Sequence, residues 1–224
     1  MLAGIGARRP SVRSAAPPRI GFRLACSRRR GGQSGAYDEH MEERTTATTR
    51  PWSGRRIRIR VDEVERADGH RTKREIVEHP GAVAILAWDG ERLAMVSQWR
   101  HATGRTLLEI PAGTLEPDEV PEQTARRELA EEVGVAAERW EAGPRFYTAP
   151  GFCDELMHLY LATDLRPEHG RADADEHLEA SWMSLADALA AIDDGRIADA
   201  KTIAGIAWLA RRLRRGATDD DRDR

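Results

Sequence analysis

Three carboxylates concentrate in one short stretch of the chain, at Glu128, Glu131 and Glu132. The steps from 128 to 131 and from 128 to 132 are the i,i+3 and i,i+4 spacings of an α-helix, so the three side chains would share one helix face. Like charges at this spacing repel one another, and no interleaved lysine offsets them. Because Mg²⁺ and Mn²⁺ prefer oxygen ligands, the pattern indicates a divalent cation site.

A helix over about residues 121–133 would hold these carboxylates. Pro121 suits a first helical turn, and Gly134 suits the position after the last turn. An apolar stripe at i,i+4 spacing consists of Ala125, Leu129 and Val133. An acidic helix face is usually only solvated. Here the carboxylates lie beside the apolar stripe rather than opposite it, which favours a site over a solvated face.

The helix belongs to a longer pattern of fixed positions. They are Gly113, Glu119, Arg127-Glu128-Leu129, Glu131-Glu132 and Gly134-Val135. At every specified position the pattern resembles the box of the Nudix hydrolase family. The resemblance implies an α/β fold, namely an α/β/α sandwich with a mixed sheet. It also implies Mg²⁺-dependent hydrolysis of a nucleoside diphosphate linked to another moiety.

Roles for the acidic box residues follow from their chemistry and agree with the family. Glu128 and Glu132, one helical turn apart, should ligate Mg²⁺, or Mn²⁺ in its place. Glu131 would be a further metal ligand or a catalytic group next to the metal. The family also uses the backbone carbonyl at the position of Ala112 as a ligand.

Segments outside the box narrow the resemblance to the ADP-ribose pyrophosphatase branch. They are GAVAIL at 81–86, SQWR at 97–100, PGFCDELMHLYLA at 150–162 and GRIADAKTIAGIAWL at 195–209. Together with the box, the likeness covers about residues 52–212. The branch often has Tyr or Phe where this chain has Trp99, so an aromatic side chain is kept.

Two further residues complete the predicted catalytic set. We expect Arg127 to form an internal ion pair with Glu119 that orients the loop and the helix, rather than to contact substrate. The ADP-ribose pyrophosphatase branch places a catalytic carboxylate in the polar loop that corresponds to residues 171–179. Glu176 is the best match and Glu179 the second. Such a carboxylate would activate water or complete the metal site.

Candidates for substrate binding lie at strand ends and in one loop. Arg100 ends a predicted strand, where it could bind phosphate or simply be a solvated strand end. The loop 149–155 is rich in turn-forming residues and would supply Phe152 and Glu155. Aromatic side chains that could stack on the base, or equally be packing residues, are Trp52, Trp99 and Phe152.

The hydrophobic pattern predicts the elements that must position these residues. Predicted strands are 57–61, 74–77, 81–88, 93–99, 107–110, 146–148, 156–162 and 180–183. Predicted helices after the box begin at residue 185, capped by Ser184, and at Asp199. Asp89-Gly90 is expected to join the strands 81–88 and 93–99 as a hairpin.

The same pattern divides the chain into four parts. Residues 1–50 are expected to be a disordered Arg-rich extension, either dispensable, with Met41 as the initiator, or a transit peptide. Residues 51–78 would form an N-terminal β element with too little core of its own, which suggests a homodimer. Residues 79–215 would be the Nudix hydrolase domain, and 216–224 a disordered tail.

Composition limits the setting in which the protein works. A chain of 224 residues with 40% hydrophobic content can build one domain with a proper core. A net charge of −3 gives no reason to expect nucleic acid. The two cysteines, Cys26 and Cys153, are expected to be reduced thiols in the cytoplasm. No apolar run approaches the ~18 residues that span a bilayer, so no membrane association is expected.

The function expected from the resemblance is hydrolysis of ADP-ribose, or a related ADP-sugar, to AMP and a sugar 5-phosphate. Within enzymes, the alternative is a broader nucleoside diphosphate sugar pyrophosphatase, including one that acts on GDP-mannose. A different class is a non-catalytic ADP-ribose sensor, which predicts a degraded box. Intact carboxylates at Glu128, Glu131 and Glu132 argue against the sensor.

Overall fold

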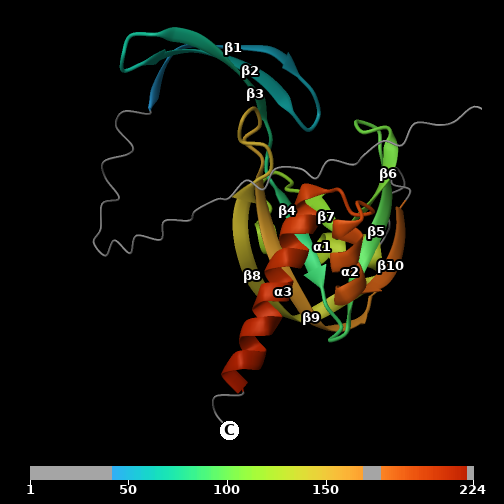
Figure 1. Ribbon diagram of the computed structural model, residues 1–224. Helices are drawn as coiled ribbons and strands as arrows, with labels where there is room; N and C mark the ends of the chain where they lie inside the picture. Colours follow the sequence, from blue (N-terminus) through green and yellow to red (C-terminus); the bar gives the residue numbers. More distant parts are fainter. Residues whose placement is uncertain (1–41, 169–177, 221–224) are drawn as a thin grey trace, which may run out of the picture. The chain divides into compact units, whose positions relative to one another are not determined.

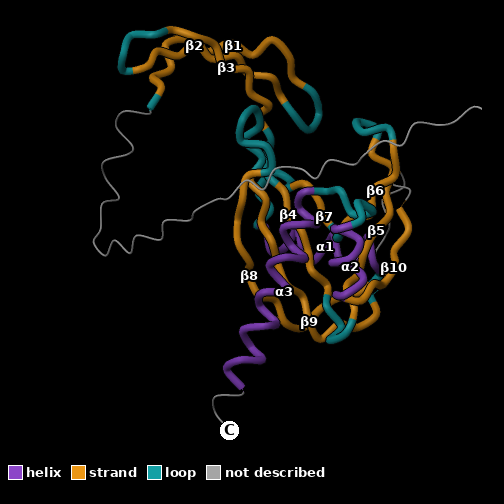
Figure 2. The backbone as a smooth tube through the Cα atoms, viewed as in Figure 1, coloured by secondary structure: helices purple, strands orange, loops and turns teal. Residues whose placement is uncertain are grey.

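The computed structural model describes residues 42–168 and 178–220, with side chains described as far as Arg215. All of them belong to one compact unit, Met41–Arg224. Figure 1 shows the elements and Figure 2 the loops between them. In chain order the elements are β1 (Glu43–Ser53), β2 (Arg58–Arg66), β3 (Arg71–Glu78), β4 (Ala82–Ala87), β5 (Arg92–Arg100), β6 (Arg105–Glu109), β7 (Ala112–Thr114), α1 (Pro121–Val133), β8 (Val135–Tyr147), β9 (Leu156–Pro167), β10 (Leu178–Ser184), α2 (Leu185–Asp193) and α3 (Ala200–Asp220).

The predicted α/β class with a mixed sheet is confirmed. One sheet has the strand order β7-β4-β9-β8, in which β4 and β9 run parallel and the other pairs antiparallel. A second, antiparallel sheet has the order β10-β5-β6. The strands β1, β2 and β3 form a separate antiparallel sheet, which is the predicted N-terminal β element.

Strand β4 is the centre of the core because every one of its residues is buried. Its alternate side chains enter two different apolar clusters. Ala84 and Leu86 pack in a cluster with residues of α2 and α3. Val83 and Ile85 pack in a cluster with residues of α1. The sheets are therefore covered by α2 and α3 on one side and by α1 on the other, which is the expected sandwich (Figure 1).

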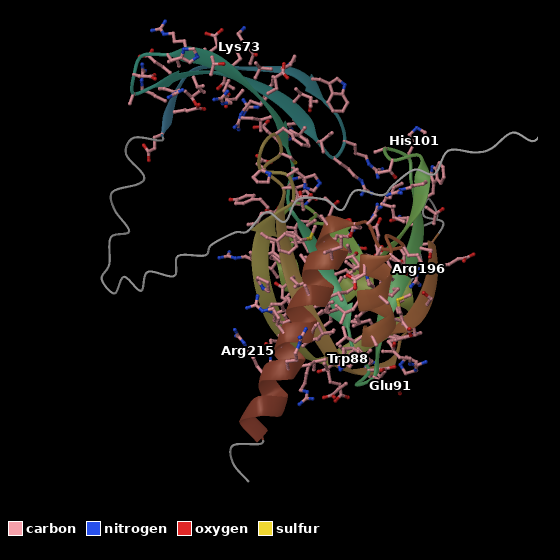
Figure 3. The ribbon with its side chains drawn as sticks, viewed as in Figure 1. Lys73, Trp88, Glu91, His101, Arg196 and Arg215 are labelled. Atoms are coloured by element: carbon pink, nitrogen blue, oxygen red, sulfur yellow. The ribbon has the colours of Figure 1, made fainter. Side chains whose placement is uncertain are left out.

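The predicted hairpin across Asp89-Gly90 is wrong, although the turn exists. Gly90 has φ 104, and Asp89 Oδ1 accepts hydrogen bonds from the backbone N–H groups of Glu91 and Arg92. The strands on either side nevertheless enter different sheets, and between them Trp88 and Leu93 form an isolated bridge. Figure 3 labels Trp88 and Glu91 at this turn. The reason is that β4 is hydrogen-bonded to β7 and β9 on its two edges, so no edge remains for β5.

Strand β8 is far longer than the predicted strand 146–148. Most of its residues are polar or half-exposed, so no apolar run marks it. Gly143-Pro144 also reads as a loop in the sequence, but a register shift between Ala142 and Arg145 accommodates the proline within the pair β8–β9. Tertiary pairing therefore forms a strand where the local pattern predicted none.

Two boundaries also differ from the prediction. Strand β1 occupies residues 43–50, which were assigned to the extension, because its threonine-rich sequence pairs with β2 without apolar alternation. Helix α3 continues to Asp220 and so includes residues 216–220, which the sequence predicts to be a disordered tail. The apolar pattern that predicts the helix stops before these residues, whereas the helical backbone does not. No helix in the described part of the chain is long and apolar enough to cross a membrane.

The helix that carries the carboxylates has the predicted bounds, Pro121–Val133. It ends because Gly134 adopts the left-handed conformation, with φ 72 and ψ 29, and its N–H donates to the Ala130 carbonyl. The next helix, α2, has the predicted cap, since the Ser184 hydroxyl accepts a hydrogen bond from the Asp187 N–H. Both termini thus follow local chemistry that the sequence shows directly.

Replacing Gly134 with alanine should lower the free energy of unfolding by about 1 kcal/mol, because a Cβ is disfavoured in the left-handed region. The nearest atom to such a Cβ, the Glu168 carbonyl oxygen, lies at 3.5 Å, so the conformation and not a clash is responsible. Urea unfolding would measure the difference. Gly134→Asn is the control and should cost less, since asparagine tolerates this conformation; equal losses for the two variants would contradict the explanation.

Candidate active site

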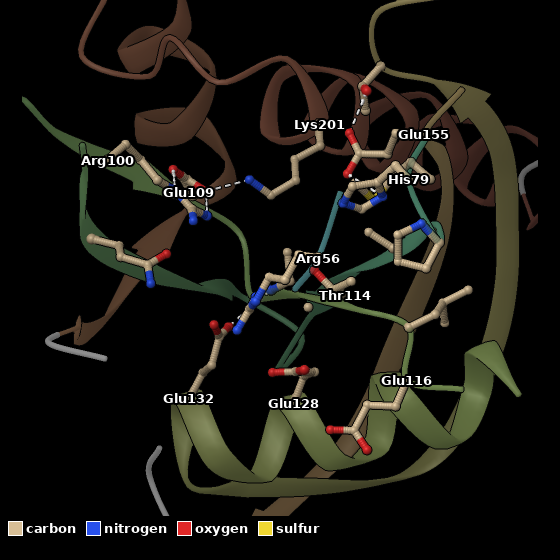
Figure 4. Close-up of a pocket in the computed structure, with 18 of the residues that line it drawn as sticks. Arg56, His79, Arg100, Glu109, Thr114, Glu116, Glu128, Glu132, Glu155 and Lys201 are labelled. Atoms are coloured by element: carbon tan, nitrogen blue, oxygen red, sulfur yellow. Dashed lines mark hydrogen bonds and ion pairs between the residues drawn. The ribbon is translucent and has the colours of Figure 1, made fainter. Parts of the chain in front are cut away.

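One large pocket gathers the predicted residues of the box together with Arg100 and Glu155 (Figure 4). The carboxylate face of α1 and the strand β7 form one wall. The ends of β5 and β6 and the first turn of α3 form another. The turn between β1 and β2 and the loop before β9 complete the lining.

Helix α1 and the backbone of β7 are in close contact at the first wall. Glu132 is buried, and its Oε2 accepts a hydrogen bond of 3.0 Å from the Ala112 N–H. Gly113 lies directly against Glu128, because a Cβ at Gly113 would be 1.9 Å from Glu128 Oε1. The glycine is therefore required for the helix carboxylates to approach the strand.

Arg127 holds the carboxylate cluster together from within the same helix. Its Nη1 donates to Glu128 Oε1 at 2.8 Å and to Glu131 Oε2 at 2.9 Å. Its Nε and Nη2 donate to the two oxygens of Glu119, each at 3.2 Å. The predicted ion pair between Arg127 and Glu119 is confirmed, and it extends to two of the three glutamates. The hydrogen bond from Arg127 holds the pKa of Glu119 below its usual value.

Arg100 lies in the pocket and is not simply a solvated strand end, whereas its binding of phosphate stays a prediction. Its Nε and Nη2 donate to the two oxygens of Glu109, at 2.8 and 2.7 Å. Glu109 is fully buried and also accepts a hydrogen bond from Lys201. Burial alone would raise the pKa of Glu109, but the hydrogen bonds and charges of Arg100 and Lys201 outweigh it and lower that pKa. The arginine is thus already anchored to a buried carboxylate.

Glu109 and Lys201 were not among the predicted site residues. Both carry a signal in the sequence, since each is a charged residue next to positions predicted to be buried. Glu109 lies within the predicted strand 107–110, and Lys201 lies in the first turn of the last predicted helix. Only the fold shows that the two elements meet.

The predicted substrate loop 149–155 contributes Glu155 to the pocket. Its carboxylate accepts a hydrogen bond from the Thr148 hydroxyl and lies 3.6 Å from His79 Nδ1. The loop is fastened to the end of β3, where the Val77 N–H donates to the Phe152 carbonyl at 2.7 Å. His79 was not predicted as a site residue, because it lies in a short linker between two strands.

The three aromatic candidates do not line this pocket. Trp52, Trp99 and Phe152 are all exposed, by 52%, 56% and 60%. Phe152 lines a separate hollow that also includes Tyr147. In their place, the turn between β1 and β2 and the first residue of β2 bring three arginines to the pocket, and Figure 4 shows Arg56 pointing into it. They are Arg55, Arg56 and Arg58.

The two candidates for the loop carboxylate are Glu176 and Glu179. Glu176 lies in residues 169–177, outside the described residues. The second candidate, Glu179, lies in β10, where it pairs with Ser97 of β5 and is exposed. Leu178, next to it, lines the pocket, so the described chain resumes at the pocket's edge.

Comparison with known proteins decides the family. A model of the NUDIX domain matches residues 78–205. The chain belongs to the Nudix family. This match covers all of the pocket-lining residues except Gly54, Arg55, Arg56 and Arg58. The Nudix box of the family is therefore the stretch from Gly113 to Val135.

Relatives of this Nudix protein carry three different names. An ADP-ribose pyrophosphatase of Bacillus subtilis is 45% identical over 75% of this chain and 93% of its own length. A methanol dehydrogenase activator of Bacillus methanolicus is 43% identical with the same coverage. A GDP-mannose pyrophosphatase of Cronobacter sakazakii is 34% identical over 63% of this chain and 80% of its own.

A solved structure supports the Nudix fold. The crystal structure of an ADP compounds hydrolase superimposes with a TM-score of 0.70 and covers 77% of this chain and 95% of its own. The two sequences are 22% identical, so this likeness concerns the fold.

The Nudix helix supplies donors that suit a hard divalent cation. Glu128, Glu131 and Glu132 offer carboxylate oxygens, and Ala112 offers a carbonyl beside them. In the described residues, however, no group of three or more His, Cys, Asp or Glu side chains is placed so that it could hold a metal ion. The Arg127 guanidinium bridges Glu128 and Glu131 instead. The donor set thus fits Mg²⁺ by its chemistry, and Arg127 provides positive charge in the same place.

Gly113→Ala should abolish most of the activity while leaving the fold intact, because the new Cβ displaces Glu128 from its position against β7. We expect kcat/KM to fall at least about hundredfold, the scale of a misplaced catalytic group. Gly151→Ala is the control, since nothing lies within 4 Å of a Cβ there. Full activity of Gly113→Ala with the protein folded by circular dichroism would refute the close approach.

Arg127→Met should make stability depend more strongly on Mg²⁺. The substitution removes the cation that bridges Glu128 and Glu131, so without metal the free energy of unfolding should fall by about 1–3 kcal/mol. This range allows for solvent screening, because the Arg127 side chain is partly exposed. Added Mg²⁺ should then raise the Tm of the variant more than that of the wild type. The neighbouring Arg126→Met, which removes an exposed pair with Glu122, is the control. An equal response to Mg²⁺ in all three proteins would count against this role.

Proposed function

We propose that this protein hydrolyses ADP-ribose, or a related ADP-sugar, to AMP and a sugar 5-phosphate. The observation that carries the proposal is the pocket in which the carboxylates of α1 face cationic side chains from other elements. The carboxylates of α1 line one wall, and Arg56 and Arg100 lie on the others. A metal-bound diphosphate needs both kinds of group, carboxylates for the metal and cations for the remaining phosphate charge.

The chain's own residues divide the work between these walls. Glu128, Glu132 and the Ala112 carbonyl would hold Mg²⁺, or Mn²⁺, with Glu131 as a further ligand or a catalytic group. When bound, the metal neutralises charge on the phosphoryl oxygens and lowers the pKa of water. Arg127 acts indirectly, because its bonds to Glu119 and two of the glutamates fix their positions.

Arg100 is the residue that we assign to the diphosphate. Two of its five N–H groups donate to Glu109, and the others are available to phosphate oxygens. Glu155 borders the same pocket and would bind the hydroxyl-bearing part of the substrate. The aromatic residues Trp52, Trp99 and Phe152 stay predictions for base contact, which would require the substrate to extend beyond the pocket.

The reaction itself is a substitution at phosphorus by water. The water oxygen forms a bond to one phosphorus, and the bond from that phosphorus to the bridging oxygen breaks. A carboxylate takes the proton of the water, and Glu176 is our candidate for it. The products are two phosphate monoesters, AMP and the sugar 5-phosphate.

The second candidate function is hydrolysis of a broader range of nucleoside diphosphate sugars, and it is supported by the relative named GDP-mannose pyrophosphatase. One relative is named a methanol dehydrogenase activator, and the alternative from another class is a non-catalytic ADP-ribose sensor. The intact carboxylates of α1, held by Arg127 and by the Ala112 N–H, support catalysis instead.

We further propose that the enzyme is a cytoplasmic homodimer. The dimer is supported by the sheet β1-β2-β3, which has little core of its own and whose strand β1 is exposed along nearly its whole length. The cytoplasm is supported by Cys153, which is a free thiol in the described chain.

A panel of ADP-ribose, ADP-glucose, GDP-mannose, NADH and diadenosine polyphosphates, assayed with Mg²⁺, tests the proposed function. ADP-ribose should have a kcat/KM among the highest. Glu132→Gln should lower its kcat at least about hundredfold, because it replaces a charged metal ligand, whereas the exposed Glu138→Gln should change nothing. Poor hydrolysis of ADP-ribose would overturn the substrate assignment, and full activity of Glu132→Gln would overturn the metal-ligand assignment.

A further inference from the structure

A buried ionic cluster lies at the wall of the pocket opposite the Nudix helix. Its members are Arg100 at the end of β5, Glu109 at the end of β6, and Asp199 and Lys201 at the start of α3. Figure 4 shows Arg100 and Lys201 meeting at Glu109 from opposite sides. Nothing in the proposed reaction uses Lys201.

The position of Lys201 is unfavourable for a cation by itself. Its side chain is only 10% exposed, and burial disfavours the charged ammonium. It also lies in the first turn of α3, where the helix dipole disfavours positive charge. Two carboxylates offset these costs, since Lys201 Nζ bonds to Glu109 and lies 3.0 Å from Asp199 Oδ2.

Stability alone gives little reason for such an arrangement. A buried ionic cluster is often no more stable than well-packed apolar side chains of similar volume. The start of α3 is already fixed by other bonds. Asp199 Oδ2 caps the helix through the Thr202 N–H at 3.0 Å, and the Thr202 hydroxyl accepts the Ile110 N–H at 2.9 Å. The helix therefore does not need Lys201 to begin where it does.

The charge of Lys201 has a consequence at the pocket, however. The cations of Arg100 and Lys201 balance the carboxylates of Glu109 and Asp199. Without Lys201, this wall would carry a net negative charge next to the place where an anionic diphosphate binds. Arg100 would then face a carboxylate that no second cation neutralises, and its attraction for phosphate would be weaker.

We propose that Lys201 is a positioning residue for diphosphate binding. Lys201 neutralises the charge of Glu109 from the buried side. The exposed edge of the Arg100 guanidinium is then oriented toward the diphosphate and attracts it. The inference rests on the proposed function, because it concerns the same pocket. It adds a residue that acts through Arg100 and does not itself touch substrate.

The geometry explains why Arg100 needs such support. Its side chain is 40% exposed, so its far edge reaches solvent while its near edge is bonded to Glu109. The bidentate contact fixes the plane of the guanidinium. Lys201 bonds to Oε2, the same oxygen that accepts from Arg100 Nη2. Loss of Lys201 therefore changes both the charge and the hydrogen bonding of the group that holds Arg100.

The test compares Lys201→Met, Lys201→Gln and Lys201→Arg with wild type. Methionine keeps the stem without the charge, glutamine keeps a donor without the charge, and arginine keeps the charge. The binding probe is α,β-methylene-ADP, whose diphosphate is not cleaved, titrated by calorimetry with Mg²⁺ at fixed concentration. The exposed Arg211→Met, on the same helix, is the control.

We expect the two uncharged variants to bind the probe about tenfold more weakly, the scale of one partly screened charge. They should raise KM for ADP-ribose by a similar factor and leave kcat within about threefold. Lys201→Arg should restore binding to within about threefold of wild type. The loss should shrink at high ionic strength, which a merely structural defect would not do.

Unchanged probe binding in folded Lys201→Met or Lys201→Gln would overturn the inference, and so would an equal loss in Lys201→Arg. If none of the three folded, the cluster would be required for folding and the positioning role would be rejected. The two proposals remain separable, because wild type that binds the probe but does not hydrolyse ADP-ribose contradicts only the proposed function. Wild type that does not bind the probe contradicts both.

Discussion

Repulsion among the carboxylates of α1 is the constraint on which the rest of this structure depends. The chain places three glutamates within one turn and then surrounds them with compensating groups. Arg127 bonds to Glu128 and Glu131 from the same helix, and the Ala112 N–H bonds to Glu132 from the strand β7. Gly113 allows the strand to come that close. The carboxylates of the helix therefore suit a divalent cation, while Arg127 and the Ala112 N–H offset their repulsion.

On the opposite wall of the pocket, like charges are again close together, but here they are positive and a carboxylate offsets their repulsion. Arg100 and Lys201 are cations close together, and the buried Glu109 joins them. The two walls are connected through a short stretch of backbone, in which Ile110 bonds to α3 and Ala112 bonds to α1. The short segment between β6 and β7 thus links the carboxylates of α1 to the ionic cluster of Arg100, Glu109 and Lys201.

Local chemistry made part of this predictable from the sequence. The bounds of α1, its glycine cap, the Ser184 cap and the ion pair of Arg127 with Glu119 all follow from residues close in the chain. Strand partners did not follow, because β4 and β5 are adjacent in sequence yet enter different sheets. Glu109 and Lys201 were missed for a related reason, since they are 92 residues apart and only tertiary packing brings them together.

That separation also bears on how the pocket is assembled during synthesis. The Nudix helix and its carboxylates leave the ribosome well before α3, and local contacts can form early. The hydrogen bonds of the Ile110 N–H to Thr202 and of Lys201 to the Glu109 carboxylate can form only after α3 has been synthesised. Until then a charged group and a backbone donor that will become buried remain exposed to water. The pocket wall around Arg100 can therefore be completed only after the last helix has been synthesised, so binding competence arrives with that helix.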